Sequence, residues 1–313
     1  MTTHSHLDLP VGRYRLNFTT QTPLSLPAYS GSAWRGVFGR ALRETACVTG
    51  AKSCDGCMLQ GSCSYPYLFE TPPLPHQGVL VGSKSAPHPY VLRPSPDREL
   101  EPEQPLSIEL LLFGSGNHYL PYAVHALKQA GHAGLGRRRG QLTLHSVQQQ
   151  VDGQWSEIHS AALPLTPHTA TPISIPAVPS AARITLHTPL RMRRKNIYIT
   201  PERFAFSDLF NGLTLRISQL TLRHTGSQPD VDYTWLASLA RVQDVLEPSL
   251  RWFDWGRYSQ RQQASMKMGG IIGEFSLEGE HLAQFWPWLW LGQYTHAGKA
   301  CTMGLGQYSI TTI

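Results

Sequence analysis

A segment rich in proline, threonine and serine divides the sequence and limits the folds that the chain can adopt. It runs from Leu163 to Ala181 and reads LPLTPHTATPISIPAVPSA. Proline lacks the backbone N–H that a helix interior or a central strand needs, so neither element continues through this segment. Because 313 residues exceed the size of one ordinary hydrophobic core, we expect two domains, at 1–165 and 182–313, joined by a linker at 166–181.

The first half has strands and helices in alternating order. Residues 11–18 alternate apolar with polar side chains, which indicates a half-buried strand. Trp34, Phe38 and Leu42 then recur at helical spacing after Ser32, which we expect to cap the helix. A strand at 106–113, a helix at 119–130 and a strand at 140–147 complete this half.

The second half repeats this order. It begins with a strand at 182–187, continues with helices within 207–223 and 234–250, and ends with strands at 270–277 and 307–310. Both halves therefore predict an α+β fold of two tandem ferredoxin-like (RRM-like) domains. The alternative is a single larger antiparallel sheet with inserted helices.

The charge of the chain favours a polyanionic ligand. Lysine and arginine number 27 against 21 acidic residues, a net charge of +6. The basic residues also cluster, at Arg137–Arg139 and at Arg191–Lys195. No secretion signal and no apolar run of membrane-spanning length is recognisable, so we expect a cytoplasmic protein without membrane contact. The apolar stretch Phe285–Leu291 is too short to span and is expected to be buried.

Four of the five cysteines form a cluster. They are Cys47, Cys54, Cys57 and Cys63, spaced C-x6-C-x2-C-x5-C, whereas Cys301 is far away in sequence. In a cytosolic chain this spacing favours a structural zinc site over disulfides, with an iron–sulfur cluster or unliganded thiols as alternatives. Four thiolates would leave no open position on the metal, so the predicted role is to fold the cysteine-rich insertion at about 47–63.

Two glycine-rich turns lie near the ends of the two halves. Residues 296–306 (HAGKACTMGLG) combine three glycines with Lys299, and residues 131–140 (GHAGLGRRRG) combine glycines with three arginines. Bare backbone lets N–H groups approach phosphate oxygens. Because the GxxxxGK[ST] pattern is absent, a nucleotide-triphosphate site is not indicated. The pair indicates an internal duplication that holds an RNA backbone; a plain turn is the alternative for each.

A third basic stretch contains aromatic residues. Residues 251–275 interleave basic with aromatic side chains, a combination typical of single-stranded RNA binding. The basic residues are Arg251, Arg257, Arg261 and Lys267, and the aromatic residues beside them are Trp252, Phe253, Trp255 and Tyr258. An aromatic core strip with an exposed basic edge would give the same pattern.

Taken in order, these segments resemble the CRISPR repeat-RNA (pre-crRNA) processing endoribonucleases of the RAMP superfamily. The motifs that carry the resemblance are LPAYSGSAWRGVFGRAL (26–42), CSYPYLFETP (63–72), GLGRRRGQLTL (134–144), TPLRMRRK (188–195), RYSQRQ (257–262), MGGIIGEF (268–275) and HAGKACTMGLGQY (296–308). They cover most of the chain.

The resemblance implies two tandem ferredoxin-like domains with a C-terminal glycine-rich loop. It also implies cleavage of repeat RNA without a catalytic cofactor, in which the ribose 2′-OH attacks the adjacent phosphate and leaves a 2′,3′-cyclic phosphate and a 5′-OH. The expected partners are repeat RNA, the mature crRNA that stays bound, and other subunits of a CRISPR effector complex.

The reaction needs a proton acceptor, cations beside the phosphorane and a proton donor. Family members often place a histidine and a tyrosine near the first helix, but this chain has Tyr29 and Arg35 there and no histidine. We therefore predict His296, Tyr29 and Arg35 as catalytic residues, with His132 as an alternative and electrostatic catalysis by arginines alone as another. The residues expected to bind RNA are Arg40, Arg43, Arg137, Arg138, Arg139, Arg191, Arg193, Arg194, Lys195, Arg257, Arg261, Gly298, Lys299, Gly304 and Gly306.

Two other functions remain open at this point. A non-catalytic RAMP-type subunit that grips a guide RNA would also lack the helix histidine. A zinc-stapled scaffold unrelated to RNA would explain the cysteines alone.

Overall fold

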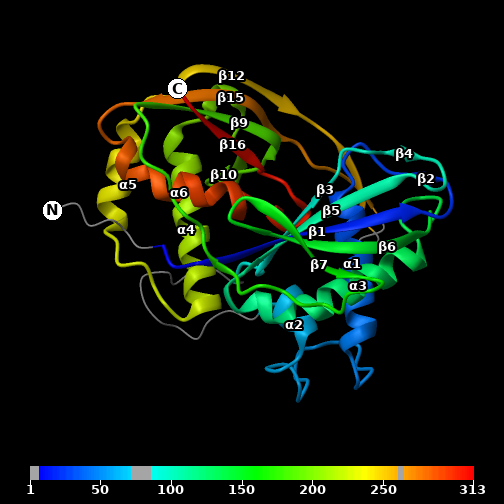
Figure 1. Ribbon diagram of the computed structural model, residues 1–313. Helices are drawn as coiled ribbons and strands as arrows, with labels where there is room; N and C mark the ends of the chain where they lie inside the picture. Colours follow the sequence, from blue (N-terminus) through cyan, green and yellow to red (C-terminus); the bar gives the residue numbers. More distant parts are fainter. Residues whose placement is uncertain (1–6, 72–85, 260–263) are drawn as a thin grey trace. The chain divides into compact units, whose positions relative to one another are not determined.

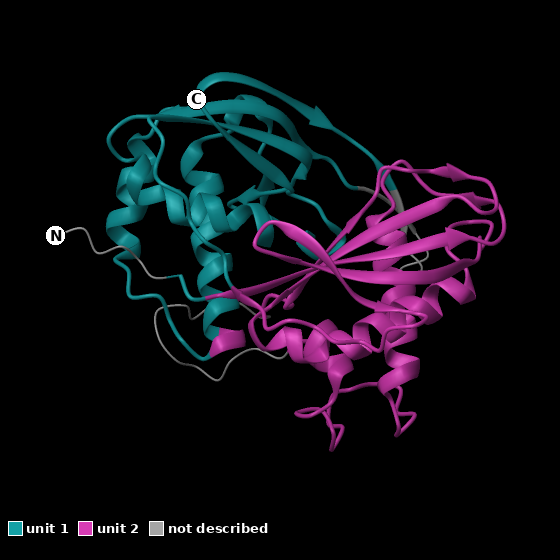
Figure 2. Cartoon of the chain, in the orientation of Figure 1, with its two compact units in different colours: residues 1–8, 172–222, 226–313 teal, residues 9–171, 223–225 magenta. Residues whose placement is uncertain are grey.

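The computed structural model describes residues 7–71, 86–259 and 264–313 (Figure 1). The chain forms two compact units (Figure 2). Unit 1 comprises residues 1–8, 172–222 and 226–313, and unit 2 comprises residues 9–171 and 223–225. The division falls between Thr171 and Pro172, inside the segment predicted as a linker. The last turn of one helix of unit 1, Arg223–Thr225, belongs to unit 2.

Unit 2 is built around an antiparallel sheet. Its strands are β1 (Pro10–Thr20), β3 (Tyr90–Pro94), β5 (Pro105–Phe113), β6 (Leu142–Val151) and β7 (Gln154–Ser160), in the order β3-β5-β1-β6-β7, and β8 (Thr171–Pro172) also pairs with β1. The helices are α1 (Gly31–Ala46), α2 (Ser64–Phe69) and α3 (Leu120–Ala133), the last preceded by a 3-10 turn, Gly114–Tyr119. Two short strands, β2 (Leu24–Ser25) and β4 (Glu99–Leu100), pair separately.

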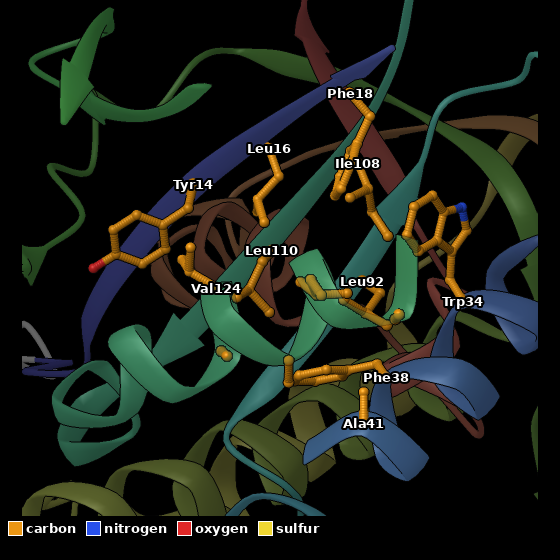
Figure 3. Packing of buried hydrophobic residues seen from close by; sticks show 14 of the residues in the cluster. Tyr14, Leu16, Phe18, Trp34, Phe38, Ala41, Leu92, Ile108, Leu110 and Val124 are labelled. Atoms are coloured by element: carbon orange, nitrogen blue, oxygen red, sulfur yellow. The ribbon is translucent and has the colours of Figure 1, made fainter. Parts of the chain in front are cut away.

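The core of unit 2 lies between the sheet and the helices. Because side chains alternate along a strand, Tyr14, Leu16 and Phe18 of β1 all point to the same face, where they meet Trp34 and Phe38 of α1 (Figure 3). Helix α3 adds Val124 and Leu127 to this cluster. The opposite face of β1 carries Arg13, Arg15 and Asn17, which are partly exposed.

Unit 1 repeats this topology with a four-stranded sheet. Its strands are β9 (Ala181–Leu190), β12 (Leu246–Phe253), β15 (Gly270–Glu278) and β16 (Tyr308–Thr312), in the order β12-β15-β9-β16. Its helices are α4 (Phe206–Thr225), α5 (Tyr233–Val242) and α6 (Leu282–Thr295). Two hairpins complete the unit: β10 (Arg193–Arg194) with β11 (Ile197–Tyr198), and β13 (Gly256–Ser259) with β14 (Ala264–Lys267). Two short 3-10 turns lie at Pro201–Arg203 and Cys301–Met303.

The two units share one ferredoxin-like plan. In each, a strand and a helix are followed by two strands, a further helix and a strand that pairs with the first. Helices α2 and α5 and strand β7 are additions to this plan. The prediction of an α+β fold with two tandem ferredoxin-like domains is thereby confirmed, and the alternative of one large sheet is excluded. The largely buried stretch Phe285–Leu291 lies within α6, which continues through Pro287.

Two local predictions were wrong. The helix predicted within 234–250 ends at Val242, and Leu246–Phe253 forms the edge strand β12 instead. Helix α1 starts at Gly31 after Ser30, so Ser32 lies inside the helix and does not cap it. Within the part of the chain that the structure describes, no helix combines the length and the apolar character needed to cross a membrane.

Candidate nucleic-acid interface

The glycine-rich loop of unit 1 connects α6 to β16 and folds tightly onto its own backbone. Gly298, Gly304 and Gly306 all have positive φ angles, of 78°, 86° and 69°, which glycine adopts without steric cost. A Cβ atom on Gly306 would lie 1.8 Å from the carbonyl oxygen of Ala297. The conformation of the loop therefore requires glycine at this position.

Several amide groups of the loop are already used within the protein. The N–H of Gly304 donates to Cys301 O at 2.7 Å, and that of Gly306 donates to Pro189 O at 3.1 Å. These two glycines, predicted as phosphate contacts, therefore shape the loop and do not turn their amides to a ligand in this structure. Lys299, in contrast, is exposed at the loop surface.

His296, the predicted proton acceptor, is fully buried. Its side chain has no exposed surface, and its Nδ1 lies 3.1 Å from the carbonyl oxygen of Leu305, at the other end of the loop. A group without exposed surface does not reach an RNA substrate. The geometry thus points to His296 as a residue that holds the two ends of the loop together and does not support its predicted role in proton transfer.

Arg191 links the loop to two other parts of unit 1. Its carbonyl oxygen accepts from Lys299 N at 2.8 Å, while its guanidinium donates to Gly269 O at 2.8 Å and to the Tyr198 hydroxyl at 2.6 Å. Only 7% of the residue is exposed. Both Nη atoms of Arg191 thus donate inside the protein, and this geometry does not support the predicted direct contact with RNA.

The β10–β11 hairpin displays the rest of the predicted basic cluster. Arg193, Arg194 and Lys195 are exposed, and Lys195 has a positive φ of 48° at the turn. Arg194 forms an ion pair with Asp208 of α4, so part of its charge is compensated. Arg193 and Lys195, together with Lys299, form what we call the hairpin–loop surface, in which Arg191 joins the hairpin to the loop.

Tyr198 lies at the base of this hairpin and was not singled out from the sequence. Its hydroxyl accepts hydrogen bonds from both Arg191, at 2.6 Å, and Arg193, at 2.9 Å. Partial burial raises the pKa of the phenol, but the two guanidinium groups outweigh that effect, so the pKa of Tyr198 is lowered. The only sequence signal was an aromatic residue across a short turn from the arginines.

The aromatic stretch of unit 1 divides into exposed and buried side chains. Trp252 and Phe253, at the end of the edge strand β12, are 38% and 37% exposed, whereas Trp255 is only 7% exposed. Gly269, whose carbonyl Arg191 holds, lies directly against the indole of Trp252: a Cβ atom there would lie 2.5 Å from it. The predicted contacts Arg257 and Arg261 lie outside the side chains that the structure describes.

The glycine-rich turn of unit 2 occupies the equivalent place between α3 and β6. Leu135 and Gly140 close it with two backbone hydrogen bonds of 2.9 Å, and Gly136 packs against Ser25 O. Arg137, Arg138 and Arg139 are all exposed on the turn. The turn therefore presents three cations on a rigid backbone.

The remaining predicted residues of unit 2 lie on or near α1. Tyr29 and Arg35 are partly exposed, and Arg40 is exposed. The guanidinium of Arg35 lies 5.0 Å from the ring centre of Phe69 on α2. Arg43 donates to the carbonyl oxygens of Ala51 and Lys52, at 2.6 and 2.7 Å, so it holds the start of the cysteine-rich insertion.

The cysteine-rich insertion does not form a metal centre in this structure. Cys47, Cys54, Cys57 and Cys63 are free and partly exposed, and the Thr49 hydroxyl lies 3.8 Å from the sulfur of Cys47 and 4.0 Å from that of Cys57. Among the described residues, no three or more histidine, cysteine or acidic side chains are grouped to hold a metal ion. The zinc prediction is therefore not supported.

Two family models match the chain, one over each half. Residues 9–170 match the model AF_1859_N, described as an N-terminal domain. Residues 184–308 match the model of the CRISPR-associated endoribonuclease Cas6. A search of curated proteins gives no match.

Solved structures of Cas6 proteins share the fold over nearly the whole chain. Thermus thermophilus Cas6 (TTHB231) is 14% identical, with a TM-score of 0.55 over 97% of this chain and 99% of that one. The Cas6 (TTHA0078) product complex is 16% identical, with a TM-score of 0.54 over 96% and 100%. A chain of a partial Cas6-RT-Cas1–Cas2 complex is 13% identical, with a TM-score of 0.56, and the match covers 97% of this chain and 46% of that one.

Two ferredoxin-like domains in tandem, each with a glycine-rich turn before the strand that pairs with its first strand, form the fold that the chain shares with these Cas6 structures. The family models make the assignment more specific. The chain belongs to the CRISPR repeat-RNA processing proteins of this type, with an AF_1859_N domain followed by a Cas6 endoribonuclease domain.

Proposed function

We propose that this protein cuts CRISPR repeat RNA without a metal ion, by attack of the 2′-OH on the adjacent phosphate, and that it stays bound to the crRNA product. The hairpin–loop surface is the observation that carries the proposal. It presents the exposed cations Arg193, Lys195 and Lys299 on two segments that Arg191 holds together. Cations on a fixed backbone bind the phosphodiesters of RNA.

The in-line attack needs few chemical groups. The 2′-oxygen forms a bond to phosphorus as the 5′-oxygen leaves, so one proton leaves the 2′-OH and one is delivered to the 5′-oxygen. We assign delivery of the proton to the leaving 5′-oxygen to Tyr29, which is then re-protonated by water, and charge stabilisation to Arg35; the 2′-OH proton passes to water. Both side chains are partly exposed near the start of α1. His296 contributes through the shape of the loop.

Retention of the product follows from the number of exposed cations. Arg137–Arg139 in unit 2 and the hairpin–loop surface in unit 1 give six basic side chains on rigid turns, and cleavage removes none of the phosphates that they bind. The proposed partners are therefore the repeat RNA, the crRNA and other CRISPR proteins, in line with the complexes named for the structural relatives.

The test of the mechanism uses purified protein and its cognate repeat RNA in EDTA. The matched substrate carries one 2′-deoxy nucleotide at the cleavage site. We expect cleavage of the first RNA, with a 2′,3′-cyclic phosphate end, and none of the second. Cleavage of the deoxy substrate, or a strict requirement for a divalent ion, would contradict the mechanism.

The catalytic assignments are tested on the same substrate. Tyr29→Phe and Arg35→Ala should each reduce the cleavage rate by about 100-fold or more while RNA affinity changes little. Tyr122→Phe is the matched control, because Tyr122 is an exposed tyrosine of the same unit. Wild-type rates for both variants would remove these two residues from the mechanism.

A second function is favoured by one observation. The region from Tyr29 to the end of α1 contains no histidine, and His296 is buried. Both facts suit a RAMP-type subunit that holds guide RNA without cutting it. Tight binding of the cognate repeat without cleavage would establish this function in place of the first.

A further inference from the structure

Three arginines of unit 2 converge on one carboxylate, on the sheet face opposite α1 and α3. Arg13 donates to Glu109 through Nε at 2.9 Å and Nη2 at 3.1 Å, and Arg15 Nη2 lies 3.0 Å from the same carboxylate. Arg93 of β3 approaches it at 3.8 Å. We call these four side chains the arginine cluster.

The cluster is accessible and rigid. The side chains of Arg13 and Arg15 are 25% and 32% exposed, and those of Arg93 and Glu109 are 12% and 15% exposed. Both arginines of β1 also lie over the indole of Trp155 on β7, with Arg15 3.9 Å from the ring centre. A guanidinium held by a carboxylate and by an aromatic ring loses little further freedom when it binds a ligand.

The charges of the cluster do not cancel. One carboxylate faces three guanidinium groups, so the four side chains carry a net charge of +2 in a half-buried position where screening by water is weak. Glu157 of β7 is an exposed acidic residue paired with Gln148 of β6, and strands β1 and β6 separate it from Glu109 on β5. An anion placed beside the arginines would relieve their mutual repulsion.

The surrounding side chains suit a nucleic acid better than a simple anion. Asn17, Ser146, Gln148 and Gln150 continue the polar face along β1 and β6, and Gln150 accepts a hydrogen bond from Arg13. Amides and hydroxyls of this kind bind base edges and ribose. Leu111, paired with Arg13, is buried, so the polar region is confined to one part of the face.

We infer that the arginine cluster binds the phosphate backbone of a single-stranded segment of the RNA substrate. The inference rests on the proposed function for the identity of the RNA, but it concerns a separate surface. Single-stranded RNA is the expected occupant because the polar side chains that continue from the cluster along β1 and β6 can bind the exposed bases and riboses of unpaired nucleotides. The cluster thus adds a contact that neither glycine-rich turn supplies.

The test compares charge removal with charge retention at two positions. Arg13→Gln/Arg15→Gln should weaken binding of a short unstructured RNA about tenfold and reduce the salt dependence of log K by about one to two. Arg13→Lys/Arg15→Lys should keep most of the salt dependence because the charges remain. Arg98→Gln, at an exposed arginine of the same unit, should change neither quantity.

Folding is checked by circular dichroism and thermal melting. If the double variant melts early, Arg15→Gln alone serves, because it leaves the paired contact between Arg13 and Glu109 in place. Wild-type affinity and salt dependence in a folded glutamine variant would overturn the inference. Equal losses in the lysine and glutamine variants would also overturn it, since the arginines would then act through the fold.

The outcome is separable from that of the proposed function. If the wild-type protein fails to cut its repeat RNA but the glutamine variant still binds RNA more weakly, the proposed function fails and the cluster stands. If the variant binds RNA normally but loses binding of an acidic peptide probe, poly-glutamate, the surface belongs to a protein partner and the inference fails.

Discussion

At the scale of single residues, Gly306 depends on the absence of a side chain more than any other described position of its loop. A Cβ atom at Gly306 would meet the Ala297 carbonyl oxygen at 1.8 Å, and the φ of 69° is unfavourable for other residues. We expect Gly306→Ala to reduce the free energy of unfolding by about 3 kcal/mol or more. Denaturant unfolding of the purified variant measures the loss.

Gly226 provides the control for that prediction. It also has a positive φ, of 79°, but an added Cβ atom would meet nothing within 4 Å. Gly226→Ala should therefore cost only about 1 kcal/mol, the penalty of the backbone conformation alone. Equal losses at the two positions would show that the close approach in the loop is not what requires Gly306.

The cysteines allow a second prediction at this scale. A hydrogen bond from Thr49 is the largest effect on the Cys47 thiol and lowers its pKa, whereas burial raises the pKa of Cys301. Because the thiolate is the reactive form, iodoacetamide at neutral pH should modify Cys47 well before Cys301. Mass spectrometry of the native protein over time gives the order.

Cys54 provides a second comparison with Cys47. Burial is the largest effect on the Cys54 thiol and raises its pKa, although the side chain is partly exposed. We expect it to react more slowly than Cys47. A different result would restore the zinc hypothesis. A chelator would then be needed before iodoacetamide modifies any of the four clustered cysteines, which would show that they share a metal ion; they are Cys47, Cys54, Cys57 and Cys63.

At the scale of elements, periodic segments were predictable and the edge strand was not. The strands around 11–18 and 106–113 and the helix that follows Ser30 have clear alternation or helical spacing, and they form β1, β5 and α1. In β12, most side chains are exposed on both faces, so no apolar alternation marks it as a strand. Helix propensity in 234–250 therefore extended the predicted helix too far.

The candidate site was predictable in composition but not in arrangement. Arg193, Lys195 and Lys299 were identified because they lie beside glycines or turns, and they are exposed. The burial of Arg191 and His296 follows from tertiary packing, and the sequence carries no signal for it. Arg13 and Arg15 were missed because they form the polar half of an alternating strand, a pattern that ordinary solvent exposure also explains.

Strand β12 gives a prediction of its own. Trp252 is exposed at the end of this strand, and its indole lies against Gly269, which leaves a flat aromatic surface beside the Arg191 hydrogen bonds. If an unpaired base stacks there, Trp252→Ala should weaken binding of single-stranded RNA about tenfold. Quenching of 2-aminopurine in the RNA provides an independent readout of stacking.

Trp235 is the matched control for Trp252. It is 49% exposed on α5 of the same unit, outside the hairpin–loop surface. Trp235→Ala should leave RNA binding unchanged. A similar loss in both variants would indicate a general effect on the unit and would argue against stacking at β12.

At the scale of the whole molecule, the chain is a duplicated fold with unequal surfaces. Both units place a glycine-rich turn before a strand that pairs with their first strand, between α3 and β6 in unit 2 and between α6 and β16 in unit 1. The turn of unit 2 carries three exposed arginines, whereas the loop of unit 1 carries one exposed lysine and depends on the neighbouring hairpin for further cations. The two units therefore share one backbone plan, and the positive charge is placed differently in each.

This arrangement predicts additive contributions to RNA binding. One variant replaces Arg137, Arg138 and Arg139 with glutamine, and a second replaces both Arg193 and Lys195 with glutamine. Each variant should bind RNA more weakly and with a lower salt dependence. Because the two sets belong to different units, the combined variant should lose the sum of the two binding free energies within about 0.5 kcal/mol. Titrations at several salt concentrations measure all four proteins.

If the combined variant loses clearly more or clearly less binding free energy than this sum, the two sets do not contact one RNA independently. A combined loss smaller than the sum would mean that the two surfaces bind the same part of the RNA and that either one can replace the other. A parallel measurement with Arg40→Gln, at an exposed arginine of α1, shows whether that predicted contact belongs to either set.

The buried position of Arg191 has a consequence for genetic screens. A random mutagenesis library scored for loss of RNA processing would group Arg191 with the surface arginines, although its guanidinium is turned to Gly269 and Tyr198. Its mutants would differ in one respect: raising the RNA concentration would compensate for a lost surface charge but not for a displaced hairpin and loop. Dose dependence would therefore separate residues that bind the RNA from the residue that holds them in place.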